Sequence, residues 1–468
     1  MENRPKYAKA ALFYSVGNVF NRAISLLLLP IFTRLLSTSS YGIVSTYNSW
    51  VSIATVIIGL QLSMTLRNAT TDYKGKLSQY ISSINTFIIV SFAFFGAIAI
   101  TARFLFFRDV PLLLVCFCCI HALMTSIINV ELQKQMMLVE YVKRTLLLAL
   151  PSLIAAVFGI LVIYFFPSTD YWGRITTNVA VFCVFGLVFL IGYCVKGKVY
   201  YNKEIWKYSF SLAAPLVFHG LAMVILSGFD KTMLTMLRSA GETGIYSVAA
   251  TIGTAVLVIT SSAESVWVPF FTKKMNDGEK KTVNDIGKKY LYVVTVFCII
   301  SMLCLPEILK VFSDRSYWGG VIIIPPIVLA AFVRVLYSLS ADVEYYYKST
   351  KSIAINTLIA AFLNILLNAL FIPKYGVMAA AYTTVISYGV SFFIHYLTAR
   401  KLDKDLFEFK MYFFPIIAAI AGTITTSSLI SAWFIRWSIA LALCVGVLIF
   451  LFMDKSMKTL IRGKENVH

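Results

Sequence analysis

Fourteen long apolar segments constrain this chain more than any other feature of its sequence. A run of about 18 or more apolar residues is long enough to cross the hydrocarbon core of a bilayer as a single helix. We therefore predict an all-α polytopic membrane protein with about fourteen transmembrane helices. The segments lie near residues 10–33, 42–66, 77–101, 110–133, 145–166, 175–195, 208–236, 245–271, 287–312, 318–343, 352–372, 376–398, 411–431 and 433–453.

The composition supports the same class of protein. Hydrophobic residues make up 59% of the 468 residues and charged residues only 13%, whereas a soluble domain carries about 25% charged residues. This excludes an ordinary water-soluble enzyme, and the apolar content excludes a disordered chain. The longest predicted loop, near residues 272–286, is too short to form a soluble domain.

The basic residues predict the orientation of the chain. Lys and Arg number 41 against 22 Asp and Glu, a formal net charge of +19. When the chain is threaded through fourteen spans, most basic residues fall in the tails and loops on the side that holds both termini. Cytoplasmic loops carry such an excess, so both termini are predicted to be cytoplasmic. Because these residues form no separate basic domain, no nucleic-acid partner is predicted.

Motifs for catalysis, cofactors and metals are missing from the sequence. The stretch Gly192–Lys198 has the spacing of a phosphate-binding loop, but Val199 follows it where Ser or Thr is needed. Cys116, Cys118, Cys119 and His121 resemble a metal site, although packing of small residues between helices explains them better. All eight cysteines lie in apolar runs and are predicted to be free thiols. No catalytic residue, cofactor or metal is predicted.

Two short motifs indicate an internal repeat. Tyr41-Gly42-Ile43-Val44-Ser45 follows the first span, and Gly244-Ile245-Tyr246-Ser247 follows the seventh, about 202 residues later. Six spans per copy make each copy start on the same side of the membrane, which is a parallel repeat of the kind that secondary transporters use. The predicted domains are an N-lobe at 1–200, a C-lobe at 201–400, and spans thirteen and fourteen with the tail at 401–468.

Polar side chains form stripes along the first two spans. Asn18 and Arg22 are four residues apart and share one helical face, and Asn48 and Ser52 do the same in the second span. Lipid-facing helices do not need such stripes. They can serve helix packing through small residues or line a water-filled cavity, and for the Arg22 face we favour the cavity.

Charged residues inside the spans are the strongest functional signal. A charge at the bilayer centre costs roughly 2.5–3.5 kcal/mol, so such residues face a cavity or an ion-pair partner. Glu131, Glu140 and Glu344 stand at predicted cytoplasmic helix ends, where we expect surface charges instead. The charges within spans are Arg22, Lys231 and Arg334, which are basic, and Asp230, Glu264 and Asp342, which are acidic.

Three blocks of residues carry a resemblance to a known family. They are Gly17-Asn18 through Arg22 with Leu29–Ser37 and Tyr41-Gly42, then Pro215-Leu216 with Asp230-Lys231 and Gly244–Ser247, and Asn364–Gly376. In these blocks the chain resembles the polysaccharide-exporter branch of the multidrug/oligosaccharidyl-lipid/polysaccharide (MOP) superfamily, the O-antigen-type flippases of bacteria. The family often has Arg where Lys231 stands, a change that keeps the charge and loses a bidentate donor.

The resemblance implies a structure and a function. The structure is a V-shaped pair of six-helix lobes around a cationic cavity, plus two C-terminal helices. The function is alternating access that moves polyprenyl-pyrophosphate-linked oligosaccharide from the cytoplasmic to the outer leaflet of the bacterial plasma (inner) membrane, for O-antigen- or capsule-type polysaccharide. Membrane lipid would surround it, and a polysaccharide polymerase and export machinery would be its protein partners.

Roles for individual residues follow as hypotheses. The cations Arg22, Lys231 and Arg334 would attract pyrophosphate or acidic sugars. Hydrogen bonds to the glycan would come from Asn18, Asn48 and Ser52. Coupling to a proton or sodium ion would fall to Asp230, Glu264 or Asp342.

Other functions remain open at this point. A drug/cation antiporter of the same superfamily predicts a cavity dominated by acidic residues, whereas here acidic residues do not outnumber the basic ones within spans. A lipid II-type flippase shares the count of about fourteen spans. A membrane polysaccharide polymerase needs a large external loop, and the external loops here have only about 6–12 residues. A purely structural membrane protein has no need of charges within its spans.

Overall fold

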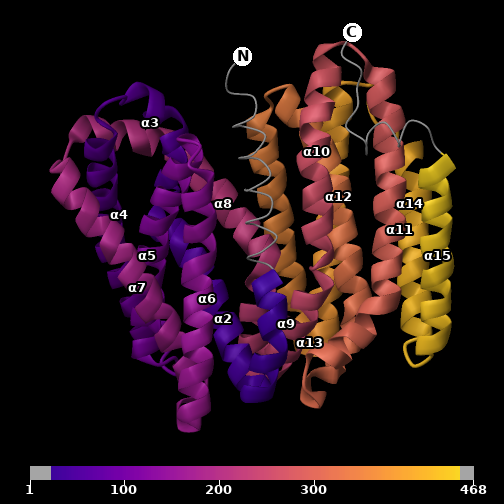
Figure 1. Ribbon diagram of the computed structural model, residues 1–468, viewed down its shortest axis with the longest axis horizontal. Coiled ribbons are helices and arrows are strands. Elements are labelled where there is room, and N and C mark those ends of the chain that lie inside the picture. The colour runs from indigo at the N-terminus through magenta and orange to yellow at the C-terminus, as the bar shows by residue number, and fades with distance from the viewer. Residues whose placement is uncertain (1–22, 454–468) are drawn as a thin grey trace. The chain divides into compact units, whose positions relative to one another are not determined.

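The computed structural model describes residues 23–453 of the chain (Figure 1). Nearly all of these residues belong to helices or to short connections between them. They divide into two compact units. Unit 1 comprises the described residues up to Ser247 together with Thr357–Ala380, and unit 2 comprises Val248–Asn356 with the described residues from Ala381 onward.

Unit 1 is a bundle in which α5 contacts α2, α4, α6 and α7. Side-chain caps start two of its helices: Ser37 accepts from the backbone of Ser40 before α2, and Asn202 accepts from Glu204 and Ile205 in α8. Its elements are the helix Ala23–Leu35, α2 (Thr38–Gly59), η1 (Leu62–Thr65), α3 (Leu66–Asp72), α4 (Leu77–Phe106), α5 (Leu112–Met137), α6 (Tyr141–Phe165), η2 (Pro167–Thr169), α7 (Asp170–Gly197), α8 (Lys203–Leu237) and the start of α9 (Ala240–Gly253).

Unit 2 is built around α11, which contacts α10, α12, α14 and α15. The long helix α13 (Thr350–Leu402) contributes its two ends to unit 2 and its middle to unit 1. The other elements of unit 2 are α10 (Val256–Asn276), α11 (Lys280–Phe312), η3 (Arg315–Ile323), α12 (Ile324–Tyr346), α14 (Lys410–Ser428) and α15 (Trp433–Met453).

The observed helices match the predicted spans. Within residues 23–453, eleven helical segments are long and apolar enough to cross a membrane. One of them, α13, holds the eleventh and twelfth predicted spans, which meet at Gly376 (φ 55°, ψ −134°). The shorter helices Ala23–Leu35 and Trp433–Gly446 fall on the first and last spans, and the first is described only from Ala23. The predicted fold class is confirmed, while the lobe boundaries and the V-shaped arrangement stay predictions.

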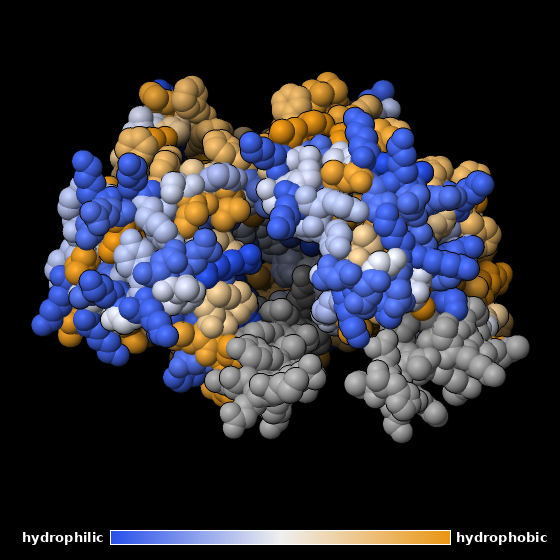
Figure 2. Space-filling model, turned by 90° about the horizontal axis from the view of Figure 1, so that it is seen from above, coloured by the Kyte–Doolittle hydropathy of each residue, from blue (hydrophilic) through white to orange (hydrophobic). Residues whose placement is uncertain are grey.

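The surface has the character expected of a protein within a bilayer. Large apolar side chains such as Phe94, Phe106 and Phe362 are exposed on the sides of the helices. Figure 2 looks onto one face of the molecule, where hydrophilic residues cover large areas. Apolar flanks and a polar end are expected of a multi-pass membrane protein.

The two copies of the repeated glycine motif meet within unit 1. Gly42 of α2 lies against Ala240 and Gly244 of α9, and Gly244 lies against Thr38 and Gly42. Each contact of one glycine therefore has its counterpart about 202 residues away, as a two-fold relation between the copies requires. A Cβ atom on either glycine would overlap a backbone oxygen of the other helix. The crossing of α2 and α9 thus needs glycine at both positions.

A buried arginine fixes the C-terminal pair of helices to unit 2. Arg436 of α15 is fully buried. Its guanidinium donates to the backbone oxygen of Leu303 in α11 at 2.6 Å, to that of Leu429 at 2.9 Å, and to the Glu307 carboxylate. Glu307 also accepts from Trp437. The last two predicted spans are therefore separate helices, held to α11 by a charge that has its hydrogen bonds satisfied.

Three loops that the topology assigns to the cytoplasmic side meet at one end of unit 2. Lys280, at the start of α11, lies 2.9 Å from Asp403 after α13, and Tyr347 after α12 donates to the same carboxylate at 2.7 Å. Asn284 bridges the next turn by donating to the Asp405 carbonyl and accepting from the backbone of Phe407. The loops 277–279, 347–349 and 403–409 therefore lie together, as the alternating spans require.

Candidate functional site

The predicted site residues fall into three groups. Asn18 and Arg22 lie outside the described residues. Asn48, Ser52, Asp230 and Lys231 belong to unit 1, and Glu264, Arg334 and Asp342 belong to unit 2.

Asp230 and Lys231 are held at the junction of α8 and α9. Asp230 is 7% exposed, and its carboxylate accepts from the hydroxyl of Tyr246 and from the backbone N–H of Lys231 at 2.9 Å. Lys231 interacts electrostatically with Asp230 and is half-buried. The acid thus ties α8 to α9 through Tyr246 and interacts electrostatically with the neighbouring cation.

Asn48 and Ser52 lie on the exposed face of α2. The opposite face of this helix buries Tyr47 and Val51 against the core of unit 1. The Ser52 hydroxyl donates to the Asn48 backbone oxygen at 2.9 Å, and among the described residues the Asn48 amide makes no hydrogen bond. The predicted role of Asn48 and Ser52 in contacting glycan stays a prediction.

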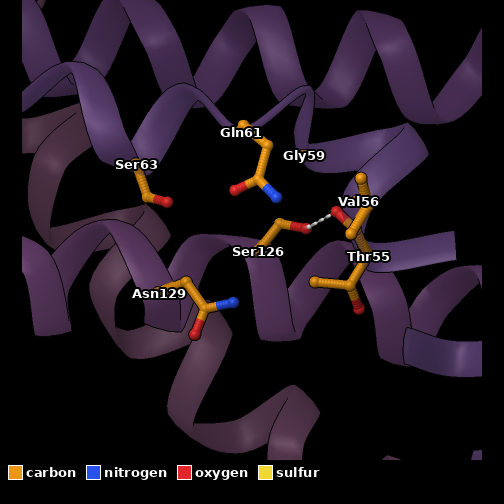
Figure 3. A pocket seen from close by; sticks show the side chains of 7 residues that line it. All are labelled: Thr55, Val56, Gly59, Gln61, Ser63, Ser126 and Asn129. Atoms are coloured by element: carbon orange, nitrogen blue, oxygen red, sulfur yellow. Dashed lines mark hydrogen bonds between the residues drawn. The ribbon is translucent and has the colours of Figure 1, made fainter. Parts of the chain in front are cut away.

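A polar pocket opens where α2 ends (Figure 3). Leu60 and Gln61 both adopt the left-handed backbone conformation, with φ of 47° and 53°, which costs energy for residues other than glycine. The break turns the chain into η1 and leaves a cavity of about 90 Å³ beside α5. The lining residues are Thr55, Val56, Gly59, Gln61, Ser63, Ser126 and Asn129.

The pocket presents neutral hydrogen-bonding groups. Thr55 and Ser126 bond to backbone oxygens of their own helices, but the side chains of Gln61, Ser63 and Asn129 make no hydrogen bond among the described residues. In Figure 3 the Gln61 amide and the Ser63 hydroxyl point toward α5. The sequence analysis missed this pocket. Its only signal was a glycine, Gly59, followed by polar residues inside an apolar run.

Glycines make room for this pocket. A Cβ on Gly59 would lie 2.7 Å from the Ser126 hydroxyl, so the glycine lets α2 approach α5. A Cβ on Gly220 of α8 would overlap the Gln61 amide. The pocket is therefore shaped by three helices of unit 1, and Gln61 is placed between two of them.

The three predicted residues of unit 2 form one cluster. Arg334, Ser338 and Asp342 follow each other every four residues along one face of α12. Glu264 of α10 interacts with all three of these side chains. Glu264 thus links the two residues: its carboxylate interacts with the Arg334 guanidinium and with the Asp342 carboxylate.

An aromatic pair borders this cluster. Trp267 of α10 donates from Nε1 to the Asp342 carboxylate at 3.0 Å. Its ring stacks on Tyr290 of α11 with centroids 5.5 Å apart and planes 8° apart. The Trp267 ring, supported by Tyr290, thus holds one side of the Asp342 carboxylate, and Glu264 of α10 interacts with the same carboxylate.

The expectation that Glu131 and Glu344 are surface charges is wrong. Glu131 is 5% exposed and Glu344 is not exposed at all. Glu131 accepts from Tyr193, and Glu344 lies 2.5 Å from His395. Both acids face inward from the ends of their helices, an orientation that position along the chain does not reveal. Glu140 is more exposed and pairs with Lys143 at 3.1 Å.

Metal ligands do not gather within residues 23–453. No group of three or more His, Cys, Asp and Glu residues there has the arrangement of a metal site. The eight cysteines are free. His121, next to the cysteine cluster, instead approaches the Tyr47 hydroxyl at 3.2 Å and the Phe182 ring at 4.7 Å. This stretch therefore packs between helices.

Comparison with solved structures identifies the fold. The chain is similar to the lipid II flippase MurJ in an inward closed conformation, with a TM-score of 0.67, 16% identity, and coverage of 94% of this chain and 98% of that one. An inward-facing multidrug-resistance MATE transporter of the MOP superfamily gives a TM-score of 0.57 at 11% identity over 83% and 95% of the two chains. Both are membrane transport proteins.

Sequence relatives add the family. An uncharacterized membrane protein of Haemophilus influenzae is 20% identical over 82% of this chain and 96% of its own length. The capsular polysaccharide biosynthesis protein CapF of Staphylococcus aureus is 23% identical over 44% of this chain and 53% of its own. Residues 7–275 match the family described as "Polysaccharide biosynthesis protein". The chain therefore belongs to the polysaccharide biosynthesis protein family and is a multi-pass membrane protein with the MOP-superfamily fold.

Proposed function

We propose that this protein flips polyprenyl-pyrophosphate-linked oligosaccharide repeat units from the cytoplasmic to the outer leaflet, by alternating access, for surface polysaccharide biosynthesis. The observation that carries the proposal is the family match over residues 7–275. The fold supports it, because a similar fold serves the flippase of another lipid-linked sugar precursor, lipid II. The similar solved structures are a flippase and a transporter, and we propose no enzymatic activity.

Physical chemistry explains why a lipid-linked glycan needs such a protein. Each hydroxyl group that enters hydrocarbon without a hydrogen bond costs about 4–8 kcal/mol. A few sugars make spontaneous crossing negligible. A polar path that replaces the lost hydrogen bonds removes most of this barrier.

Neutral donors and acceptors for the sugars come from α2 and the adjoining pocket. Asn48 and Ser52 offer an exposed polar face. We propose the same role, hydrogen bonding to the glycan, for Asn18 of the first span. Gln61 and Asn129 add amide groups that have no partner among the described residues. Amides and hydroxyls of this kind match the hydroxyl and acetamido groups of sugars.

Cations and acids take separate roles in the proposal. Arg22 and Lys231 attract the pyrophosphate or acidic sugars, with Arg334 as the third cation. Glu264 and Asp342 are candidates for ion coupling, because the two carboxylates interact with each other and only Glu264 also interacts with Arg334. Asp230 is a further candidate, although its hydrogen bonds to Tyr246 and Lys231 also give it a structural role.

The proposed setting is the bacterial plasma (inner) membrane with both termini in the cytoplasm. The basic residues in the tails and in the loops on that side support this orientation. A polysaccharide polymerase and export machinery would then receive the flipped units on the outer side.

Gene deletion tests the proposal directly. Loss of the protein should trap the lipid-linked precursor in the cytoplasmic leaflet, where a membrane-impermeant sugar-modifying reagent cannot reach it in intact cells. Wild-type protein should restore access. Lys231→Ala should restore at most about a tenth of it, if the cation contributes the roughly 1.4 kcal/mol that a tenfold change represents. Lys143→Ala, at an exposed ion pair, is the matched control. Normal export without the protein would refute the proposal.

A lipid II-type flippase is the second candidate, favoured by the structural similarity to MurJ. It predicts that the protein restores growth to cells depleted of their own lipid II flippase. It also predicts that deletion leaves the surface polysaccharide precursor accessible from outside. Either result would favour this candidate over the first.

A further inference from the structure

Unit 2 contains an acid–imidazole pair that no part of the proposed function uses. Glu344 of α12 and His395 of α13 both have side chains with 0% exposure. His395 Nδ1 lies 2.5 Å from Glu344 Oε1. The edge of Tyr337 covers the imidazole, with ring centroids 4.7 Å apart and planes 65° apart.

The pair is isolated from other charges. Within residues 23–453, neither side chain has another ion-pair partner. The remaining polar atoms, Glu344 Oε2 and His395 Nε2, are buried and make no hydrogen bond there. Buried polar atoms in native structures are almost always satisfied. Glu344 Oε2 and His395 Nε2 are thus the two atoms of the pair that can still bond to water or exchange a proton.

Neighbouring helices bring few titratable groups, and these belong to other contacts. Glu264 of α10 and Tyr290 of α11 interact with Asp342. Tyr412 of α14 packs on Tyr396 and interacts electrostatically with Asp342. None of these groups contacts Glu344 or His395.

Charge balance limits how many protons the closed pair can hold. With one proton the pair is neutral overall, either as imidazolium with carboxylate or as imidazole with carboxylic acid. A second proton gives imidazolium with carboxylic acid, a net charge of +1, and loss of the proton gives −1. An uncompensated charge in a fully buried site is unfavourable. Only hydration of the site permits either change.

We propose that Glu344 and His395 form a proton-binding site that holds one shared proton while α12 and α13 are packed together. A second proton binds when the packing loosens and water reaches Nε2 and Oε2. Imidazole suits this role because it exchanges protons near neutral pH. Proton concentration then biases the equilibrium between the two packings. The inference goes beyond the proposed function and holds whatever the transported molecule is.

Histidine NMR on the full-length protein tests the site without any substrate. The chain has four histidines, so selective ¹⁵N labelling in lipid nanodiscs gives signals from four imidazole rings, each with two nitrogens. Gln substitutions at His121, His219 and His468, made one at a time, assign the three others and leave His395. We expect His395 to show two sets of signals between pH 5 and 8, whose ratio changes at least tenfold with pH, because the buried site exchanges slowly.

His121 is the matched control, since it is also buried but faces the Tyr47 hydroxyl rather than a carboxylate. Its signal should stay in one state over this range. Glu344→Gln should abolish the second set of His395 signals, and Glu344→Asp, which keeps the charge, should retain it if the Gln variant does not fold. A single His395 signal that moves continuously with pH, or one that does not change from pH 5 to 9, would overturn the proposal.

Discussion

Two buried carboxylates, one in each unit, show how the repeated halves of the chain have diverged. Glu131 lies near the end of α5, the fourth predicted span, and Glu344 lies near the same end of α12, the tenth. Each approaches a helix two spans further along, at Tyr193 and His395, respectively. These two partners are about 202 residues apart, the same separation as Gly42 and Gly244.

Glu131 and Glu344 differ in their hydrogen-bond and ion-pair partners. Glu131 accepts from Tyr193, from Gln135 at 2.9 Å and from Lys134 at 3.2 Å. Lys134 thus gives Glu131 an ion-pair partner on the same helix. Glu344 has only an imidazole, which can lose or gain its charge. One half thus carries a fixed anchor and the other a group able to respond to pH.

At the crossing of α2 and α9, the two copies of the glycine motif make reciprocal contacts, so equivalent substitutions can be compared there. Gly42→Ala and Gly244→Ala each push a Cβ into a backbone oxygen that cannot move aside. We expect each to destabilise the fold by about 3 kcal/mol or more, with equal losses because the contact is reciprocal. Thermal unfolding in detergent measures this. Gly96→Ala, where added atoms meet open space, is the control. A large loss at one glycine only would break the two-fold interpretation.

The next largest loss of stability is expected at the Glu344–His395 pair, where the two halves differ. His395→Leu leaves Glu344 buried without a partner, which costs about 3–5 kcal/mol for a charged carboxylate. The loss should be larger at pH 8 than at pH 5, because acid favours the uncharged carboxyl group. Unfolding measured at both pH values tests this, and Glu344→Gln combined with His395→Leu should recover most of the stability. An equal loss at both pH values would contradict the idea that Glu344 becomes charged.

Substitution at the Glu131 site of unit 1 should lower the stability of the fold by less than substitution at His395. Lys134→Ala removes one of three donors to Glu131, together with the bond from Lys134 to the Tyr193 hydroxyl, and leaves the donors Tyr193 and Gln135 in place. We expect a loss of about 1.5–3 kcal/mol that does not change between pH 6 and 8. Lys143→Ala, which breaks an exposed pair, should cost less than about 1 kcal/mol. A strong pH dependence at Lys134 would make the two halves alike rather than different.

The sequence predicted the spans well and the contacts between them poorly. Spans follow from hydropathy alone, because the bilayer forces each segment to satisfy its own backbone hydrogen bonds. The grouping of Arg334 and Asp342 on one face also follows from helical spacing. The partners of Glu344 and Asp230 could not be predicted, since the first lies 51 residues away on another helix and no local pattern marks it. The left-handed turn at Leu60 and Gln61 was hidden inside an apolar run.

The smallest expected effect concerns Asp403, in the loop contact at the end of unit 2. The corresponding residue of the first copy, 202 positions earlier, is Tyr201, which has no carboxylate. Burial raises the pKa of Asp403, but hydrogen bonds from Lys280 and Tyr347 outweigh it and leave the pKa below its usual value. A lowered pKa in the folded state stabilises the fold above the ordinary value of about 3.9, and this contribution is lost as the pH falls through the folded-state pKa. Asp403→Asn should therefore cost about 1 kcal/mol near neutral pH and almost nothing near pH 3. Unfolding across that range checks the sign. A cost that grows toward acid would mean that the loops of unit 2 are held together by Tyr347 and the backbone rather than by the charge of Asp403.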